Sequence, residues 1–233
     1  MKISDTSAII VCAGNSSRMN GINKQFADLG GRPVVAHSLL AFEQCSEISE
    51  IIVVTKDEFF SRISQIAKEY NISKLAHIIS GGETRQESVI NGLKHVSEEN
   101  KMIAVHDGAR PLVRCSDIRR VIADARIFGG ATLGVPVKDT IKTVSDGLIT
   151  DTPPRSSLYI TQTPQVFRKS SYLRGVEFAL RNGLDFTDDC QLAESIGIKV
   201  CMTTGHYSNI KITTPEDIAV AGLLLEEEKK CTE

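Results

Sequence analysis

The first candidate site is a short polar loop that follows an apolar run near the N-terminus. Residues 8–13 are small or apolar, residues 14–18 read Gly-Asn-Ser-Ser-Arg, and Lys24 follows shortly after. A strand that ends in small residues lets the backbone bend tightly and bring its N–H groups close to an anion. Because Arg18 and Lys24 stand beside it, this loop suits an anion that carries several charges.

The loop differs from the common nucleotide and nucleophile motifs. It lacks the Gly-Lys-Ser/Thr of a Walker A loop and the G-x-G-x-x-G dinucleotide fingerprint, and it does not complete a G-x-S-x-G elbow. A plain tight turn is the alternative interpretation. Arg18 and the Lys24-Gln25-Phe26 segment favour phosphate binding over that alternative.

A second candidate segment, residues 81–88, reads Gly-Gly-Glu-Thr-Arg-Gln-Glu-Ser and leads into a helical pattern. A double glycine before a helix lets the backbone approach a ligand at the helix N-terminus, where Ser88 could hydrogen-bond it. A plain connecting loop explains the same residues equally well.

A third segment, residues 106–111, reads His-Asp-Gly-Ala-Arg-Pro and ends an apolar run. Asp107 could bind a divalent cation, hold a hydroxyl group or cap the next turn. Together with Arg110 across a Gly-Ala turn, it suits a phosphate and metal environment. His106 is more typical of a packed residue at a strand end, and we assign it no role.

The remaining candidates lie at junctions between regular segments. Thr140 precedes a hairpin pattern, Arg155 and Thr163 follow it, and Lys211 precedes the last helical pattern. Arg155 and Lys211 are isolated cations on otherwise neutral segments, so a solvated surface position is the alternative for both.

The elements that must position these residues alternate between strand and helix patterns. The expected strands are 8–13, 51–55, 77–80, 102–106, 131–137 and 198–202, and the expected helices include 33–42, 57–70 and one that starts at Pro215 with Thr214 as its N-cap. This alternation predicts a mainly parallel sheet that is covered on both faces. The binding loops are expected at the carboxyl ends of the strands.

Residues 138–161 break this alternation. Residues 140–144 alternate β-branched and polar side chains, Asp146-Gly147 is typical of a hairpin turn, and Leu148-Ile149 resume the pattern. We expect a hairpin arm that projects from one domain covering residues 1–233. Isolated hairpins usually pack against a partner, which favours a homodimer, and a mobile surface flap is the alternative.

Composition excludes several classes of protein. The net charge is −2 over 233 residues, so no global field favours nucleic acid or acidic membrane, and any anion site must be local. The six cysteines show no C-x-x-C spacing, which argues against a zinc site or a disulfide framework and for a reducing cytoplasm. We expect no signal peptide, because the first strand starts at once, and no apolar run reaches the roughly 20 residues of a membrane span.

Taken together, these segments resemble the 2-C-methyl-D-erythritol 4-phosphate cytidylyltransferase family of the non-mevalonate isoprenoid pathway. The resemblance runs nearly end to end and is highly specific in combination. The segments that carry it are Ala13-Gly14, Arg18-Met19, Lys24-Gln25, Gly81-Gly82 with Arg85 and Ser88, His106-Asp107, Ala109-Arg110-Pro111, Pro136-Val137, Asp139-Thr140, Thr163-Pro164-Gln165, Thr187-Asp188, Asn209-Ile210-Lys211 and Pro215-Glu216-Asp217.

The resemblance implies a fold, an activity and roles for individual residues. The fold is a Rossmann-like nucleotidyltransferase domain whose hairpin arm interlocks two subunits, and the substrates are CTP and a polyol phosphate, with Mg²⁺. Arg18 and Lys24 are implied to stabilise the triphosphate and the transition state, and Arg155 and Lys211 to position the substrate phosphate. The implied substrate contacts are Ala13, Gly14, Gly82, Glu83, Ser88, Asp107, Gly108, Arg110, Thr140, Thr163 and Thr187, with Asp107 also the candidate metal ligand.

The first loop departs from the family pattern, and two alternative functions are left open. The family loop usually has glycine at Ser16 and often a basic residue at Ser17, so phosphate contacts there are expected to be reorganised or weaker. A ribitol 5-phosphate cytidylyltransferase shares much of the pattern, although residues 136–142 favour the erythritol enzyme. A non-catalytic nucleotide-binding regulator is the alternative from another class, but it would need no second cation pair for an attacking phosphate.

Overall fold

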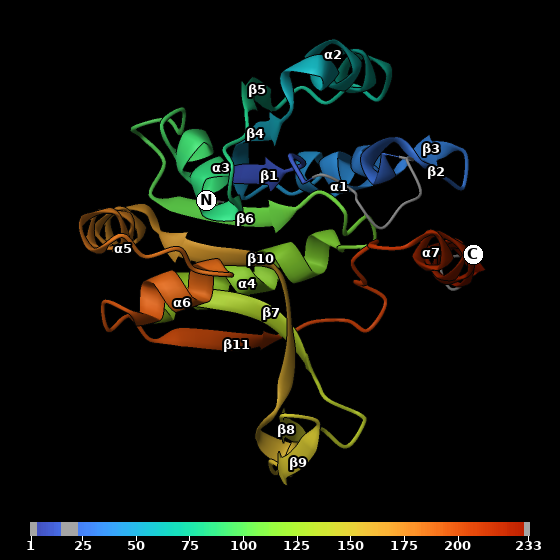
Figure 1. Cartoon of the computed structure of the whole chain (residues 1–233). Coiled ribbons are helices and arrows are strands. Elements are labelled where there is room, and N and C mark those ends of the chain that lie inside the picture. Colours follow the sequence, from blue (N-terminus) through green and yellow to red (C-terminus); the bar gives the residue numbers. More distant parts are fainter. Residues whose placement is uncertain (1–3, 15–22, 231–233) are drawn as a thin grey trace.

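A twisted central sheet organises the chain, of which this computed structural model describes residues 4–14 and 23–230. Within these residues, seven strands pair in the order β11-β7-β10-β6-β1-β4-β5 (Figure 1). All neighbours are parallel except β10, which is antiparallel to β6 and β7. The strands are β1 (Thr6–Val11), β4 (Ile48–Thr55), β5 (Leu75–Ser80), β6 (Met102–Asp107), β7 (Gly130–Pro136), β10 (Tyr159–Arg168) and β11 (Val200–Thr204). The predicted mainly parallel α/β sheet is thus confirmed.

The strand β10 corrects the sequence prediction. Residues 138–161 were expected to form an arm that stays out of the sheet, but Tyr159, Ile160 and Thr161 already pair with β7. The strand then continues to Arg168 and pairs with β6. Its pairing with β7 is interrupted between Thr161 and Gln165, around Pro164, which lacks the N–H that a regular ladder needs.

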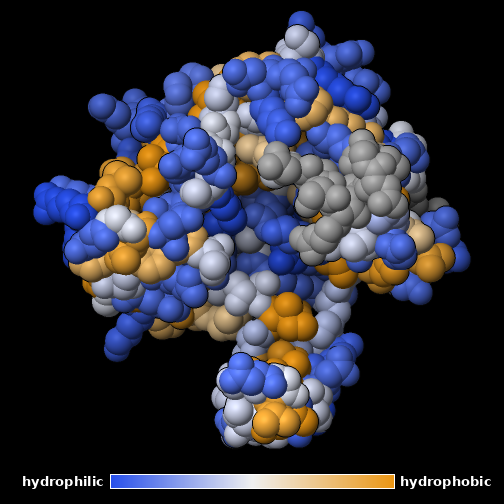
Figure 2. Space-filling model, viewed as in Figure 1, coloured by the Kyte–Doolittle hydropathy of each residue, from blue (hydrophilic) through white to orange (hydrophobic). Residues whose placement is uncertain are grey.

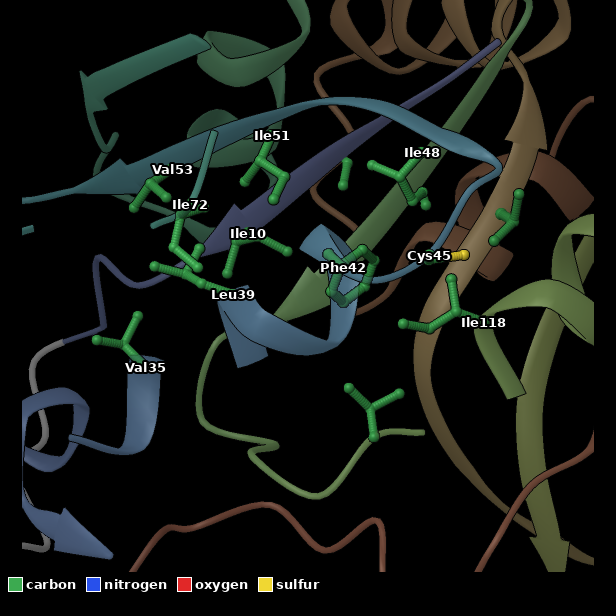
Figure 3. Packing of buried hydrophobic residues seen from close by; sticks show 14 of the residues in the cluster. Ile10, Val35, Leu39, Phe42, Cys45, Ile48, Ile51, Val53, Ile72 and Ile118 are labelled. Atoms are coloured by element: carbon green, nitrogen blue, oxygen red, sulfur yellow. The ribbon is translucent and has the colours of Figure 1, made fainter. Parts of the chain in front are cut away.

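Helices cover both faces of the sheet, because alternate residues of each buried strand point to opposite sides. On one face Ile10 packs with residues of α1 (Val34–Glu43), α2 (Phe60–Glu69) and α4 (Cys115–Phe128), including Leu39, Phe42 and Ile118 (Figure 3). On the other face Ile9 belongs to a cluster with α3 (Arg85–Leu93), α5 (Lys169–Asn182) and α6 (Asp189–Glu194). The β-branched residues of the buried strands fill both layers.

The order of the strands fixes where a ligand site can form. The chain leaves β1 for β4 and β5 on one side and then returns to place β6 on the other side of β1. The strand order thus reverses between β1 and β6, and at such a point a crevice forms at the carboxyl edge of the sheet. Val11 and Asp107, the last residues of these strands, are direct register partners.

The hairpin arm projects away from the sheet (Figure 1). Strands β8 (Thr143–Ser145) and β9 (Leu148–Asp151) pair antiparallel, and the short helix η3 (Arg155–Ser157) precedes β10. Asp146 and Gly147 both have positive φ, 51° and 80°, as a two-residue hairpin turn with primed geometry requires. The predicted turn is confirmed, although the strand pattern expected from Thr140 starts only at Thr143.

The last helix, α7 (Pro215–Lys230), packs on a small third cluster beside the main sheet. Leu29, Val34, Leu112, Ile212 and Ala221 form this cluster. Leu29 belongs to a two-stranded sheet formed by β2 (Asp28–Leu29) and β3 (Arg32–Pro33). The helix begins at Pro215 as predicted, and the Asp217 carboxylate accepts hydrogen bonds from the N–H groups of Thr213 and Thr214 at 2.7 and 2.9 Å. Among the residues described, none of the helices has the length and apolar character needed to cross a membrane.

Candidate active site

A cleft of about 840 Å³ opens at the carboxyl edge of the sheet, within the usual size of a small-molecule site. Figure 2 shows it as a hollow lined by hydrophilic residues. The predicted site residues that line it are Ala13, Gly14, Lys24, Gly82, Glu83, Ser88, Asp107 and Lys211. The loops after β1, β5 and β6 and the segment before α7 therefore meet, as the parallel sheet led us to expect.

The double-glycine loop forms one wall of this cleft. A Cβ on Gly81 would lie 2.4 Å from the Cβ of Ala13, so only glycine lets the two loops approach each other so closely. The Ser88 hydroxyl accepts a hydrogen bond from the Gly82 N–H and donates one to the Thr84 carbonyl, both at 3.0 Å. The loop thus owes its shape to Ser88, and a direct contact between this hydroxyl and a ligand remains a prediction.

The start of α3 completes the same wall. Thr84 is the N-cap, since its hydroxyl accepts a hydrogen bond from the Glu87 N–H at 3.1 Å. The Glu87 carboxylate in turn accepts one from the Glu83 N–H at 2.7 Å. These two hydrogen bonds hold the backbone between Gly82 and α3 in a defined conformation at a helix N-terminus, where anions bind favourably.

Lys24 enters the cleft from the short helix η1 (Lys24–Phe26). The Asn23 side chain caps this turn by accepting a hydrogen bond from the Gln25 N–H at 3.0 Å. The Phe26 ring packs against Phe59 with the ring centroids 5.0 Å apart, and the Arg62 guanidinium lies 4.2 Å from its centre. The lysine is thus anchored through its neighbours. Arg18 and the departures at Ser16 and Ser17 lie outside the described residues.

Asp107 lies between two cations at the base of the cleft. Its Oδ2 is 2.7 Å from the Lys211 Nζ, and its Oδ1 is 3.4 Å from the Arg85 Nε. Burial alone would raise the pKa of this carboxyl, but Lys211 and then Arg85 hold the pKa well below its ordinary value. Asp107 therefore remains ionised across the physiological range.

Thr163, which is itself hydrogen-bonded to His106, holds the backbone of Asp107 in place. The Asp107 N–H donates to the Thr163 hydroxyl at 3.0 Å. The His106 Nε2 lies 3.2 Å from the Arg110 carbonyl, which can only accept, so Nε2 carries the proton and Nδ1 accepts from the Thr163 hydroxyl at 3.0 Å. Burial lowers the pKa of His106 to about 4, so the ring is neutral. These contacts occupy the Thr163 hydroxyl, and a substrate contact through it remains a prediction.

Arg110 joins three segments behind the cleft. Its Nη1 donates to the Asn209 carbonyl at 2.7 Å and its Nη2 to the Thr161 carbonyl at 3.4 Å. Its buried Nε has no hydrogen-bond partner among the described residues, and burial lowers the pKa of the guanidinium. The side chain thereby ties β10 and the segment before Lys211 to the loop after β6.

The other predicted contacts lie outside the lining of this cleft. Thr140 and Arg155 are exposed on the arm, where the Arg155 Nη1 donates to the Lys138 carbonyl at 2.6 Å. Thr187 is exposed, and its hydroxyl donates to the Gln191 side chain at 3.0 Å. Gly108 packs over Cys12 rather than facing the cleft. Ligand contacts by these residues remain predictions.

Sequence reasoning missed the role of Arg85. This residue was part of the family pattern, but we assigned it no contact. In the structure its Nη2 lies 2.8 Å from Asp189 Oδ2, and its Nε faces Asp107. Asp189 comes from α6, and no sequence signal links it to α3. An arginine at the first position of a helix is unusual, because the positive end of the helix dipole repels it, and that position was the available hint.

A mainly parallel sheet with a phosphate-suited cleft at its switch point is the arrangement of a Rossmann-like nucleotide-binding domain. Comparison with known proteins narrows this class. The family profile of 2-C-methyl-D-erythritol 4-phosphate cytidylyltransferase matches residues 6–227. The chain therefore belongs to the 2-C-methyl-D-erythritol 4-phosphate cytidylyltransferase family.

Individual relatives agree with this assignment. The proteins of that name from Clostridium novyi (strain NT) and Caldanaerobacter subterraneus are 41% and 45% identical and cover 98% and 95% of this chain, which spans 100% and 99% of their own lengths. The crystal structure of 4-diphosphocytidyl-2C-methyl-D-erythritol synthase from Anaerococcus prevotii DSM 20548 superposes with a TM-score of 0.84 at 33% identity, covering 95% of this chain and 98% of that one. These matches favour the family over the ribitol phosphate and regulator alternatives.

Proposed function

We propose that this protein transfers CMP from CTP to 2-C-methyl-D-erythritol 4-phosphate and releases pyrophosphate. The observation that carries the proposal is the convergence of Lys24, Lys211 and the glycine-rich backbone on one cleft beside Asp107. Two lysines from separate segments suit a reaction that must bring two phosphorylated substrates together. The family membership supports the identity of both substrates.

The proposed chemistry is an in-line displacement at phosphorus. An oxygen of the substrate phosphate attacks the α-phosphorus of CTP, and the bond to the bridging oxygen of pyrophosphate breaks. Because a phosphate monoester is already ionised near neutral pH, the step needs no strong general base and no protein nucleophile. Negative charge develops on the α-phosphate and on the leaving oxygen, so cations held in place before the reaction lower the barrier.

The residues of the cleft divide this work. Lys24 neutralises the triphosphate and the charge that develops on it, the role that the family pattern also implies for Arg18. Lys211 holds the attacking phosphate. The backbone of Ala13, Gly14 and Gly82 lies where close approach to a nucleotide is sterically possible, because these residues are small.

We propose that a divalent cation, usually Mg²⁺ in this family, enters with the nucleotide. Within the described part of the chain no group of three acidic, histidine or cysteine side chains could hold a metal ion. We therefore propose that the cation is held chiefly by substrate phosphates, with one carboxylate from the protein. Asp107 is the candidate carboxylate, and the metal would replace its longer ion pair, the one with Arg85, so that the pair with Lys211 is kept. The cation would neutralise phosphate charge there.

We also propose that the arm joins two copies of this chain. It exposes apolar side chains that a monomer would leave in water, among them Leu148 at 73%, Ile149 at 64% and Val144 at 55% exposed. Figure 2 shows hydrophobic surface on the projecting arm. Arg155 and Thr140 lie on the arm, outside the lining of their own chain's cleft. Both residues can therefore serve the cleft of the neighbouring subunit.

A pyrophosphate-release assay with CTP and Mg²⁺ tests the proposed activity. The purified protein should release pyrophosphate with 2-C-methyl-D-erythritol 4-phosphate and at least tenfold less efficiently with ribitol 5-phosphate. The order of the two alcohols decides between the cytidylyltransferase activities. If the protein binds CTP but releases pyrophosphate with neither alcohol, the proposal is wrong and the hypothesis of a non-catalytic nucleotide-binding regulator replaces it.

A further inference from the structure

Five side chains from five segments form a continuous line of contacts from the core to the cleft. Tyr172 of α5 donates its hydroxyl hydrogen to Asp189 Oδ1, and Asp189 of α6 accepts Arg85 Nη2 at 2.8 Å. Arg85 at the start of α3 faces Asp107 at 3.4 Å, and Asp107 at the end of β6 pairs with Lys211 at 2.7 Å. The charges of the last four alternate in sign. The line ends at the lysine assigned to the substrate phosphate.

Arg85 divides its guanidinium unequally between the two carboxylates. Asp189 takes the Nη2 edge at 2.8 Å, and Asp107 meets only Nε at the longer distance of 3.4 Å. A guanidinium and a carboxylate prefer a bidentate pair with two parallel hydrogen bonds. If Asp189 did not hold it, Arg85 could turn its fork onto Asp107. It would then compete with Lys211 for the same carboxylate.

Asp189 is itself held firmly. Its side chain is 4% exposed, and Tyr172 is 1% exposed. Gln165 of β10 accepts a hydrogen bond from the Asp189 N–H at 2.8 Å and donates one to the Asp188 carboxylate at 3.1 Å. Burial, and then the charge of Asp189, raise the pKa of Tyr172 well above its ordinary value, so the phenol keeps the proton that it donates.

We infer that Asp189 and Tyr172 are positioning residues for the phosphate-binding lysine: they hold Arg85 away from Asp107, and so keep one carboxylate oxygen of Asp107 for Lys211. This inference rests on the proposed function, in which Lys211 holds the phosphate of the alcohol substrate. Asp189 and Tyr172 do not line the cleft, so they act only through Arg85 and Asp107.

A matched control exists elsewhere in the fold. Asp117 of α4 is also a buried carboxylate, with a side chain 4% exposed, and it pairs with an arginine, Arg120, at 2.6 Å. Neither residue lines the cleft. Asp117→Asn and Asp189→Asn therefore remove the same kind of charge from similarly buried sites. Loss of stability is expected in both, and only Asp189→Asn should affect the cleft.

Two measurements on the full-length protein test the inference. The first is the rate at which an amine-acylating reagent modifies Lys211, followed by mass spectrometry, which needs no substrate. Asp189→Asn should raise this rate severalfold, because Arg85 displaces the lysine from Asp107, and Asp117→Asn should leave it unchanged. The second is steady-state kinetics. Asp189→Asn should raise KM for the alcohol phosphate about tenfold, with KM for CTP changed less than about twofold.

Tyr172→Phe gives a graded second test, since it removes one hydroxyl and keeps the ring that packs on Phe167. Its effects on Lys211 acylation and on the alcohol phosphate KM should have the same sign as those of Asp189→Asn and be smaller. The inference is overturned if Lys211 reactivity in Asp189→Asn equals that in Asp117→Asn. Absence of pyrophosphate release by the unsubstituted protein instead overturns the proposed function, and the acylation rates still decide the positioning role.

Discussion

Gly108, a predicted substrate contact, occupies a position where the structure indicates that a side chain would collide with the core. An ideal Cβ there would lie 2.4 Å from Cys12 Sγ, and 3.2 Å from both Gln25 Oε1 and Ile10 Cγ2. The glycine cannot easily retreat, because its N–H donates to the Val11 carbonyl at 3.0 Å. We therefore predict that Gly108→Ala destabilises the protein and that Cys12→Ala relieves most of the loss.

The contact distances set the size of the expected effect. A carbon and a sulfur 2.4 Å apart overlap deeply. Cys12 is only 3% exposed, so rotation of its side chain would not move the sulfur into empty space. Overpacking of a core site costs about 1–3 kcal/mol. Cys12→Ala alone removes one methyl-sized group and should cost about 1 kcal/mol. With the sulfur gone the new methyl group fills its space, so the double variant should lose less than the sum of the singles by about 1–2 kcal/mol.

Urea unfolding of the four proteins measures this coupling directly. Gly222→Ala in α7 is the control, since nothing lies within 4 Å of its Cβ position, and alanine there should be neutral or stabilising. Because Gly108 follows Asp107, Gly108→Ala should also lower pyrophosphate release, and Cys12→Ala should restore part of it. The reasoning fails if the unfolding free energies of the two substitutions simply add.

Three further outcomes follow from the site. Lys24→Ala should lower kcat about 10²- to 10³-fold, the scale of one lost transition-state contact, and Lys68→Ala on the exposed face of α2 should not; near-normal turnover of purified Lys24→Ala refutes that role. If Arg155 acts across the dimer, verified heterodimers of Lys24→Ala and Arg155→Ala subunits should regain activity at one of their two sites, and an absence of recovery contradicts it. Burial lowers the pKa of His106 from its ordinary 6.5 to about 4, so the unfolded chain takes up this proton at a higher pH than the folded chain. The free energy of unfolding should therefore fall by up to about 3 kcal/mol as pH falls from 6.5 to 4. Thermal unfolding of His106→Gln should show a smaller change over that range.

The fold was predictable from sequence wherever local pattern and topology agreed. The apolar runs that became β1, β4 and β6 are buried on both faces, so their composition alone marks them. The turn at Asp146-Gly147 has its own chemical signature. The strand β10 has none, because Pro164 divides it and its first residues read as part of the arm. Its place between β6 and β7 depends on pairing with distant residues.

The cleft was predictable for a similar reason, and its internal contacts were not. Gly14 follows one parallel strand and Asp107 ends another. Because such strands end at one edge of the sheet, the meeting of these two residues could be argued from the order of elements. The pairing of Arg85 with Asp189 joins residues from α3 and α6, over a separation at which no periodicity acts. Likewise, Gly108 packs on Cys12 only because the fold brings these distant residues together, and no local sequence pattern indicates the contact.

The side chains around Asp107 explain why this site carries cations instead of a nucleophile and a base. The hydroxyl of Thr163 and both ring nitrogens of His106 are already engaged in hydrogen bonds, and burial keeps the ring neutral. Groups that could have moved protons are thus used to hold the carboxylate in place. The carboxylate in turn orients Lys211 at 2.7 Å. Such an arrangement supplies a fixed electrostatic field, which is what transfer between two phosphates requires and what acid–base chemistry does not.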